Sequence, residues 1–246
     1  MSLFDRKPRP IPSRDKDPDR LRDDRLFIIA CDDTCAPNQY FRFFKFSRVR
    51  IHVIPTTDGT SVASSVLARL LEVDYEDGDE RWMVLDTDHL AQGSHLRGLR
   101  RALQDAKNKG VRVAFSRPCF EIWLLLHHIG ETSVAKLANA GAVESALRTE
   151  LGEYNKTNLK QEHYPLGAVA LACARAERLD QSVGGGVIPH ANTSRVYLIL
   201  KAIAAKALPS QFPEELHGLL PKGNRGLSRG IEEGKPLVSH DVPLEG

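Results

Sequence analysis

Four short runs rich in apolar residues recur within the first 130 residues, and each is bounded by polar positions. The runs are LFIIA (26–30), VRIHVI (49–54), WMVL (82–85) and VRVAF (111–115). Such runs are typical of strands buried in a parallel sheet. The intervening segments place apolar residues at helical spacing, as at Val62, Val66 and Leu70. Strands alternating with helices predict an α/β fold built on a doubly wound parallel sheet.

The pattern changes after Gly130, where the apolar spacing becomes helical throughout. Segments 137–151, 166–179 and 195–207 each predict a helix. We therefore expect an α/β domain over residues 25–130, with a C-terminal helical region over 131–208 packed against it. The triplet at 184–186, Gly-Gly-Gly, lacks a following Gly-Lys-Ser/Thr and is read as a flexible connection rather than a phosphate-binding loop.

The two ends of the chain have little to bury. Residues 1–24 are rich in Pro, Arg, Lys and Asp, and from Pro209 onward Pro, Gly and charged residues dominate. Such compositions predict a disordered arm over 1–24 and a largely disordered tail over 209–246.

The composition says more about the cellular environment of the protein than about the reaction it performs. A length of 246 residues suits one domain with appendages, and a formal charge of +2 neither demands nor excludes a nucleic-acid partner. The four cysteines form no CxxC pair, and no apolar run approaches the roughly 20 residues that cross a bilayer. We expect a cytoplasmic protein with reduced thiols and no membrane partner, and self-association into a homo-oligomer stays open.

Acidic residues follow two of the predicted strands directly. Asp32 comes after the first strand, and Asp86 and Asp88 come after the third. Open α/β sheets bind ligands at the carboxyl ends of their strands. Mg²⁺ prefers a few carboxylate oxygens and leaves positions for water and substrate phosphates. The pattern therefore predicts a Mg²⁺ or Mn²⁺ site, although Asp88 as a helix cap and Asp86 as a solvated loop residue is an open alternative.

Glu121 strengthens the case for a metal because it lies inside the apolar segment PCFEIWLLLHH. A buried carboxylate needs compensation, which a metal, a basic residue such as Arg117, or a histidine could supply. A structural ion pair between helix and strand is the alternative.

The polar residues around that segment have their own readings. Ser116 and Arg117 directly follow the fourth strand and are placed to contact a phosphate group. His127 and His128 end the apolar segment, where structural hydrogen bonding or a helix cap is favoured over metal binding.

At these residues the sequence resembles a known family. The order of an acidic strand end, a DxD strand end and SRPCFEIWLLLHH resembles the RloB-like family of small bacterial proteins with a Toprim-like domain. The downstream segments GEYNKTNL, ARAERL and HANTSRVYLIL are similar to later segments of that family. The resemblance covers roughly residues 25–205 and leaves both ends unmatched.

The resemblance implies a Toprim-like fold and a Mg²⁺-dependent nuclease that acts on DNA or on RNA such as tRNA. According to this resemblance, Asp32 takes the place of the Toprim glutamate that acts as general acid/base, and Asp86 and Asp88 bind the metal. Glu121 matches the glutamate of the FExW segment and becomes a further ligand. Lys156 matches a lysine that approaches the scissile phosphate or stabilises the fold. Relatives are encoded beside ATPases in phage-defence or abortive-infection loci, which implies an ATPase partner and a defence role.

One segment departs from the family pattern. Where relatives usually read CEGxxTE, this chain reads CDDTCAP, with Asp32 for the glutamate and Asp33 for the glycine. The shorter side chain places the carboxylate about 1.3 Å short, and a misplacement of about 1 Å costs roughly a hundredfold in rate. Three readings stay open: an active nuclease, a Toprim-like binding or regulatory subunit without catalysis, which the altered segment favours, and, ranked last, a phosphatase-like hydrolase, because acid-rich strand ends with DxD occur there too.

Overall fold

The computed structural model describes residues 24–57, 59–88 and 95–221. Within these ranges a five-stranded sheet has the order β2-β1-β3-β4-β5. Its strands are β1 (Arg25–Cys31), β2 (Val49–Ile54), β3 (Glu80–Asp86), β4 (Arg112–Arg117) and β5 (Thr193–Ser194). The first four strands are parallel, and β5 is antiparallel to β4. The predicted doubly wound α/β fold is confirmed.

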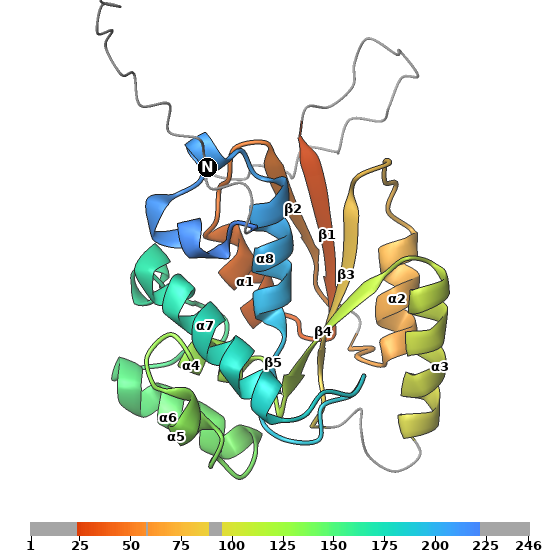
Figure 1. Cartoon of the computed structure of the whole chain (residues 1–246). Coiled ribbons are helices and arrows are strands. Elements are labelled where there is room, and N and C mark those ends of the chain that lie inside the picture. The colour runs from red at the N-terminus through yellow and green to blue at the C-terminus, as the bar shows by residue number, and fades with distance from the viewer. Residues whose placement is uncertain (1–23, 58, 89–94, 222–246) are drawn as a thin grey trace, which may run out of the picture.

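Helices cover both faces of the sheet (Figure 1). On one face α2 (Ala63–Leu71) and α3 (His95–Asn108) pack against Ile28, Met83 and Phe115. The opposite face carries the alternate strand residues, such as Ile29 and Val84, and belongs to a second core cluster. Successive strand side chains point to opposite faces, so burial of both sets requires helices on both sides.

The second face is covered by the remaining helices, which come mostly from the C-terminal half. They are α1 (Ala36–Arg42), α4 (Glu121–Leu125), α5 (Glu131–Val134), α6 (Ala140–Leu151), α7 (Leu166–Ser182) and α8 (Val196–Lys206). One continuous core cluster joins strand residues such as Trp82 to Leu147 of α6, Val169 of α7 and Ile199 of α8. The helical region therefore shares its core with the sheet.

One detail differs from the pattern expected along the chain. The two-residue strand β5 interrupts a region expected to be helical throughout. Helix α1 ends at Arg42, before the aromatic residues Phe43 and Phe44, and the apolar segment after Pro118 contains only the short helix α4. None of the helices in the described part of the chain is long and apolar enough to span a membrane.

The folded part also extends past the boundary expected at residue 208. Two 3-10 helices, η2 (Pro209–Gln211) and η3 (Glu214–Leu219), follow α8. Phe212, Leu216 and Leu220 are buried in the same core cluster as α7 and α8. Of the predicted arm and tail, residues 1–23 and 222–246 lie outside the described ranges.

His127 has a structural role, as its sequence context favoured. Its Nδ1 lies 2.9 Å from the carbonyl of Trp123, so Nδ1 carries the proton, and its Nε2 accepts a hydrogen bond from the Tyr40 hydroxyl at 3.0 Å. Burial lowers the pKa of His127 to about 3. The folded protein therefore holds this imidazole neutral.

This burial predicts a loss of stability in acid. Below pH of about 6.5 the unfolded chain protonates this histidine, while the folded chain does not until about pH 3. The unfolded state then binds one proton more than the folded state, so the free energy of unfolding decreases as the pH is lowered through this window. The decrease is about 1.4 kcal/mol per pH unit for one proton. Denaturant titrations from pH 7 to pH 4.5 should show a shallower fall for His127→Gln than for the wild type. An unchanged slope would contradict the prediction, and His95→Gln, an exposed position on α3, is the control.

Candidate functional site

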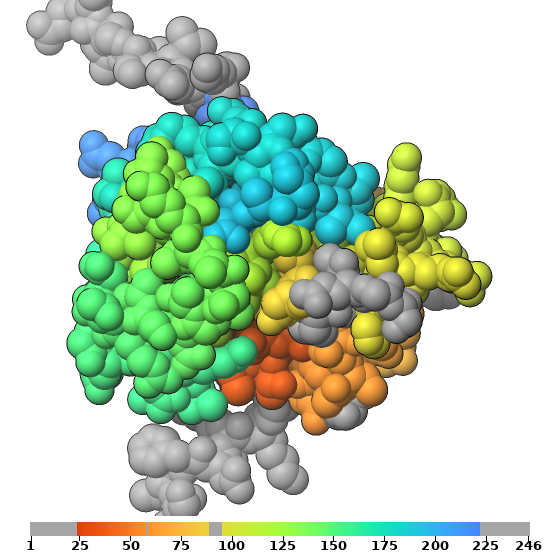
Figure 2. Space-filling view, turned by 90° about the horizontal axis from the view of Figure 1, so that it is seen from below, coloured from red at the N-terminus to blue at the C-terminus, as the bar shows by residue number. Residues whose placement is uncertain are grey.

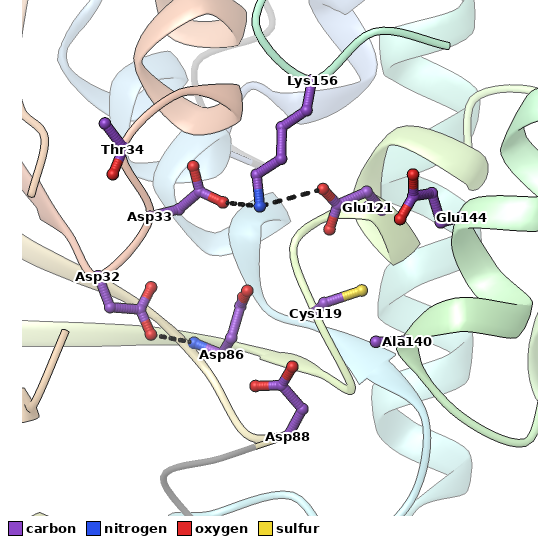
Figure 3. Close-up of a pocket in the computed structure, with 10 residues that line it drawn as sticks. All are labelled: Asp32, Asp33, Thr34, Asp86, Asp88, Cys119, Glu121, Ala140, Glu144 and Lys156. Carbon is purple, nitrogen blue, oxygen red and sulfur yellow. Dashed lines mark hydrogen bonds and ion pairs between the residues drawn. The ribbon is translucent and has the colours of Figure 1, made fainter. Parts of the chain in front are cut away.

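A cavity of about 340 Å³ opens at the carboxyl ends of β1 and β3 (Figure 3). Seen from this end of the sheet, it lies where the first strands meet the helical region (Figure 2). Its lining residues are Asp32, Asp33, Thr34, Asp86, Asp88, Cys119, Glu121, Ala140, Glu144 and Lys156. Six of these are carboxylates and one is a lysine, so the cavity has a large excess of negative charge.

Asp32 and Asp86 form the floor of the cavity. Asp32 follows the last residue of β1, and its Oδ2 accepts a hydrogen bond of 2.8 Å from the backbone N–H of Asp86, the last residue of β3. The two residues are 7% exposed, and among the described residues no donor reaches the second carboxylate oxygen, Oδ1, of either. Buried carboxylate oxygens are costly when unpartnered, so this pair is suited to a cation.

Backbone hydrogen bonds fix the turn that carries Asp88. The N–H groups of Thr87 and Asp88 both donate to the carbonyl of Pro118 at 3.1 Å. This holds the Asp86–Asp88 turn against the segment that leads from β4 into α4, where Cys119 and Glu121 lie. Asp88 is exposed, yet its carboxylate reaches the cavity (Figure 3). The acids of the first and third strands and of α4 therefore meet at one place.

Lys156 is the cation of the cavity. Its Nζ forms an ion pair with Asp33 and lies 3.6 Å from Oε1 of Glu121. Burial acts to lower the pKa of Lys156, but the attraction to Glu121 and Asp33 outweighs it and holds that pKa above the ordinary value. The lysine is therefore charged and neutralises part of the acidic cluster.

The compensation for Glu121 differs from the partners that the sequence suggested. Glu121 is 6% exposed, and its Oε1 accepts a hydrogen bond of 2.9 Å from the hydroxyl of Tyr154 in addition to the contact with Lys156. Arg117 does not reach it, since its Nη1 donates instead to the carbonyl of Pro189. An ion pair is thus present between the buried Glu121 and a half-exposed lysine, and it is made with the loop that precedes α7.

Asp33 organises the segment that enters α1. Its Oδ1 accepts hydrogen bonds from the N–H groups of Cys35 at 2.6 Å and Ala36 at 3.1 Å, while Oδ2 faces Lys156. One carboxylate therefore caps the start of α1 and anchors the lysine. Where the family pattern has a glycine, this chain has a side chain with two structural roles.

Gln39 of α1 clamps the loop that carries Lys156. Its Nε2 donates to the carbonyl of Lys156 at 2.7 Å, and its Oε1 accepts from the N–H of Leu159 at 2.8 Å. Both bonds cross from the first helix to a loop far along the chain. The position of Lys156 over the acids therefore depends on this amide side chain.

We expect Gln39→Ala to lower the free energy of unfolding by about 1–2 kcal/mol, because two backbone groups of the loop lose their partner. Denaturant unfolding measures the loss, and the Leu159 amide should exchange its hydrogen faster. Gln104→Ala is the control, since the Gln104 side chain is exposed and bonds only to Asn108 on its own helix. Equal stability of the two variants would show that the clamp contributes nothing.

Burial and neighbouring acids strongly raise the pKa values of the two aspartates at the floor of the cavity. Burial, together with the nearby charges of Asp33 and Asp88, raises the pKa of Asp32 to about 8. Burial also raises the pKa of Asp86 well above its ordinary value, with Asp32 and Glu121 adding to the effect. The Cys119 thiol is likewise held neutral, because burial and Glu121 raise its pKa. A cation at this place would offset both the burial and the repulsion that raise these pKa values.

The donor set therefore fits a hard divalent cation. Carboxylate oxygens are the ligands that Mg²⁺ and Mn²⁺ take in proteins, and Mg²⁺ keeps several waters rather than filling its shell with side chains. Among the described residues no three His, Cys, Asp or Glu side chains already stand as a complete metal-binding group. Asp32, Asp86 and Asp88 could hold such an ion with water, and Glu121 lies across the cavity from them.

Two predicted substrate contacts lie away from the cavity. Ser116 is fully buried, and its hydroxyl pairs with that of Ser194 at 3.0 Å across the β4–β5 ladder. Arg117 is tied to the 183–193 loop through Pro189. Neither lines the cavity, because β5 covers this end of β4, so the prediction that they contact a phosphate group finds no support in their position.

The sequence also missed one residue of the site. Glu144 of α6 lines the cavity and forms an ion pair of 2.6 Å with Arg148 one turn later. Nothing in the spacing along α6 distinguishes it from the other charges of an amphipathic helix. Only the packing of α6 against α4 brings it to the acids.

The comparisons agree with this picture of the chain. A family model described as RloB-like protein matches residues 27–203. No curated protein and no solved structure matches the chain. Every residue that lines the cavity lies within the matched range.

Proposed function

The chain belongs to the RloB-like family, and on that basis we propose that it is a Mg²⁺-dependent Toprim-type nuclease that cleaves DNA or RNA. One observation carries the proposal. Asp32 and Asp86 lie side by side at the carboxyl ends of parallel strands, each with a buried carboxylate oxygen that no donor of the described residues satisfies. Such an arrangement costs stability unless a cation uses it, and perturbed acids in a cleft are typical of catalytic sites.

The residues would divide the work of phosphodiester hydrolysis. Asp86 and Asp88 would hold the metal, with Glu121 as a further oxygen donor. A bound Mg²⁺ supplies charge that polarises the phosphate and favours ionisation of water. Asp32 has the free Oδ1 that a general base requires. Lys156, held over the cavity by Asp33 and Gln39, offers its ammonium group to a phosphate oxygen.

The biological setting is a part of the same proposal. The resemblance to the RloB-like family supports a role in antiviral defence, in the cytoplasm, with activity controlled by an ATPase partner. The substrate is a nucleic acid, either DNA or tRNA. The acidic cavity itself repels phosphates unless a divalent cation is bound, which makes cleavage strictly metal-dependent.

Cleavage assays test the nuclease directly. Plasmid DNA, single-stranded DNA and bulk tRNA are incubated with the full chain in Mg²⁺, in Mn²⁺ and in chelator, with and without the ATPase encoded beside it where there is one. Metal-dependent products that Asp88→Ala abolishes would support the proposal. Rates equal to background for the wild type on every substrate and in each metal would refute it.

A second candidate is a Toprim-like binding or regulatory subunit without catalysis. The observation that favours it is the double engagement of Asp33, which caps α1 and pairs with Lys156. In that reading the charges stabilise the fold rather than a reacting phosphate. Mn²⁺ binding by calorimetry without cleavage would favour this second function over the nuclease.

A further inference from the structure

The outer edge of β4 is only partly covered. Strand β5 pairs with β4 at Ser116 and Arg117 alone. The N–H of Arg195 donates a further hydrogen bond of 2.8 Å to the carbonyl of Phe115. Within the described residues no strand pairs with this edge between Arg112 and Ala114. Alternate residues of a strand direct their backbone groups to the same side, so Val113 presents its N–H and C=O to the open edge as Phe115 does.

A groove of about 850 Å³ lies along this open edge. In Figure 1, β4 lies between α3 on one side and α8 on the other. One wall is a single stripe of α3, formed by Arg100, Leu103, Gln104 and Lys107 at helical spacing. The opposite wall is the loop before β5, where Val187 is 69% exposed. The groove therefore occupies the place where the next strand of an α/β sheet would lie.

The charges of the groove are all positive. Its lining contains Arg100, Lys107, Arg112 and Arg195, and no carboxylate. Arg112 pairs with Glu80 and Arg195 pairs with Asp180, both outside the lining. For Arg100 and Lys107 the described residues provide no acidic partner. Two exposed cations on α3 thus flank the apolar Leu103 without neutralisation.

We propose that this groove binds an extended segment of a partner protein, which adds to the sheet along β4 and carries acidic residues toward α3. An added strand satisfies the open backbone groups of Val113, and pockets for alternate side chains give selectivity. Side chains on one face of a strand lie about 7 Å apart, and Arg100 and Lys107 lie about 10 Å apart along the axis of α3. Acidic residues at positions i and i+4 of the added strand lie about 14 Å apart, within reach of the long side chains of Arg100 and Lys107, and an apolar residue between them faces Leu103.

The same charges argue against two other occupants. A second copy that paired its own β4 edge here would bring Arg100, Lys107 and Arg112 of both copies together, which like-charge repulsion opposes. A nucleic-acid strand needs exposed aromatic faces or a row of phosphate contacts. Phe115 in the groove is fully buried, and only two of the groove's cations lack an acidic partner among the described residues. The open backbone edge has no role in the binding of a nucleic-acid strand.

Synthetic peptides test the surface on the full chain. The probe is the acetylated and amidated peptide Thr-Glu-Thr-Val-Thr-Glu-Thr, with binding followed through the NMR shifts of the backbone amides of β4. We expect saturable shifts centred on Val113. Replacing both Glu by Lys should weaken binding at least about tenfold, the amount that two surface charge pairs provide together. Methylation of alternate peptide nitrogens should abolish the shifts, because it removes the ladder hydrogen bonds without changing charge.

Matched variants locate the contact. The double variant Arg100→Glu, Lys107→Glu should bind the acidic peptide at least about tenfold more weakly. The double variant Arg97→Glu, Arg101→Glu changes the same charge on the same helix outside the groove and should bind as the wild type does. Equal weakening in both double variants would overturn the proposal, as would undiminished binding of the methylated peptide. Preferential binding of a twelve-nucleotide oligothymidylate at the same residues, or a dimer that protects the Val113 amide, would also overturn it.

Discussion

We expect Asp86→Asn to lose metal-dependent cleavage by about a hundredfold or more, since loss of a metal ligand costs at least as much as loss of a group supporting one. Asp86 is the last residue of β3, and in the part of the chain that the structure describes no donor reaches its buried Oδ1 beside Asp32. Asparagine keeps the shape and the backbone hydrogen bond to Asp32 but removes the charge that would attract a cation. The measurement is the initial rate of cleavage in saturating Mn²⁺.

The same variant should be more stable than the wild type in the absence of metal. Asp86 is buried among Asp32, Asp33 and Glu121, so its charge is repelled from several sides. Removing it should raise the free energy of unfolding by about 1 kcal/mol, the usual trade between stability and a functional site. Mn²⁺ should raise the melting temperature of the wild type and leave that of Asp86→Asn unchanged, because only a ligand bound to the native state stabilises it.

Asp105→Asn is the matched control for both measurements. Asp105 is an exposed residue of α3 that does not line the cavity. It should leave cleavage, stability and the Mn²⁺-induced shift as they are in the wild type. If Asp86→Asn binds Mn²⁺ with wild-type affinity by calorimetry, the metal role of Asp86 is wrong.

The location of the acids follows from rules that the sequence obeys closely. WMVL is recognisable as a buried strand, so the next residues, Asp86 and Asp88, had to emerge at its carboxyl end, and Asp32 did so after LFIIA in the same way. Parallel pairing of β1 with β3 then brings these acids together without further information. The strands and the doubly wound sheet were predictable for the same reason, because hydrophobic periodicity reports burial directly.

The residues that pair with the acids were harder to predict from the sequence, because they come from loops. Glu121 needed compensation, and the sequence offered Arg117 as a neighbour, yet the loop before α7 supplies Tyr154 and Lys156 instead. The family resemblance singled out Lys156, but only the structure shows that Gln39 and Asp33 hold it in place. Such contacts depend on tertiary packing that no local pattern encodes.

Two short elements, β5 and the folded segment after α8, were not predicted from the sequence, for opposite reasons. Strand β5 has two residues, too few for any periodicity, yet it buries Ser116 and ties Arg117 to the loop before it. Phe212, Leu216 and Leu220 do recur at a spacing of one helical turn, but the Pro- and Gly-rich composition around them favoured a disordered tail. Their burial against α7 and α8 shows that three apolar side chains attach this segment to the core despite the polar composition around them.

The second large effect concerns Asp32, where this chain departs from the pattern of the family it belongs to. We expect Asp32→Glu to raise the rate of metal-dependent cleavage by up to about a hundredfold, the amount that a misplacement of about 1 Å costs. Asp32 Oδ2 is held by the Asp86 N–H at the floor of the cavity, and the cavity of about 340 Å³ has room for one more methylene. The longer side chain would carry its carboxylate farther into the cavity, with the glutamate that the family pattern has at this position.

Two companion variants separate reach from charge. Asp32→Asn keeps the hydrogen bond from Asp86 and removes the charge, so it should reduce cleavage to background. Asp33→Glu lengthens the neighbouring acid, and it should lower the rate because it disturbs the cap of α1 and the pair with Lys156. A lower rate in Asp32→Glu would show that the aspartate is already placed correctly and that the extra methylene crowds the site. Identical background rates for the wild type, Asp32→Glu and Asp32→Asn on DNA and tRNA would remove the catalytic role of Asp32. The acidic cavity would then be the binding site of a subunit that acts through its partners.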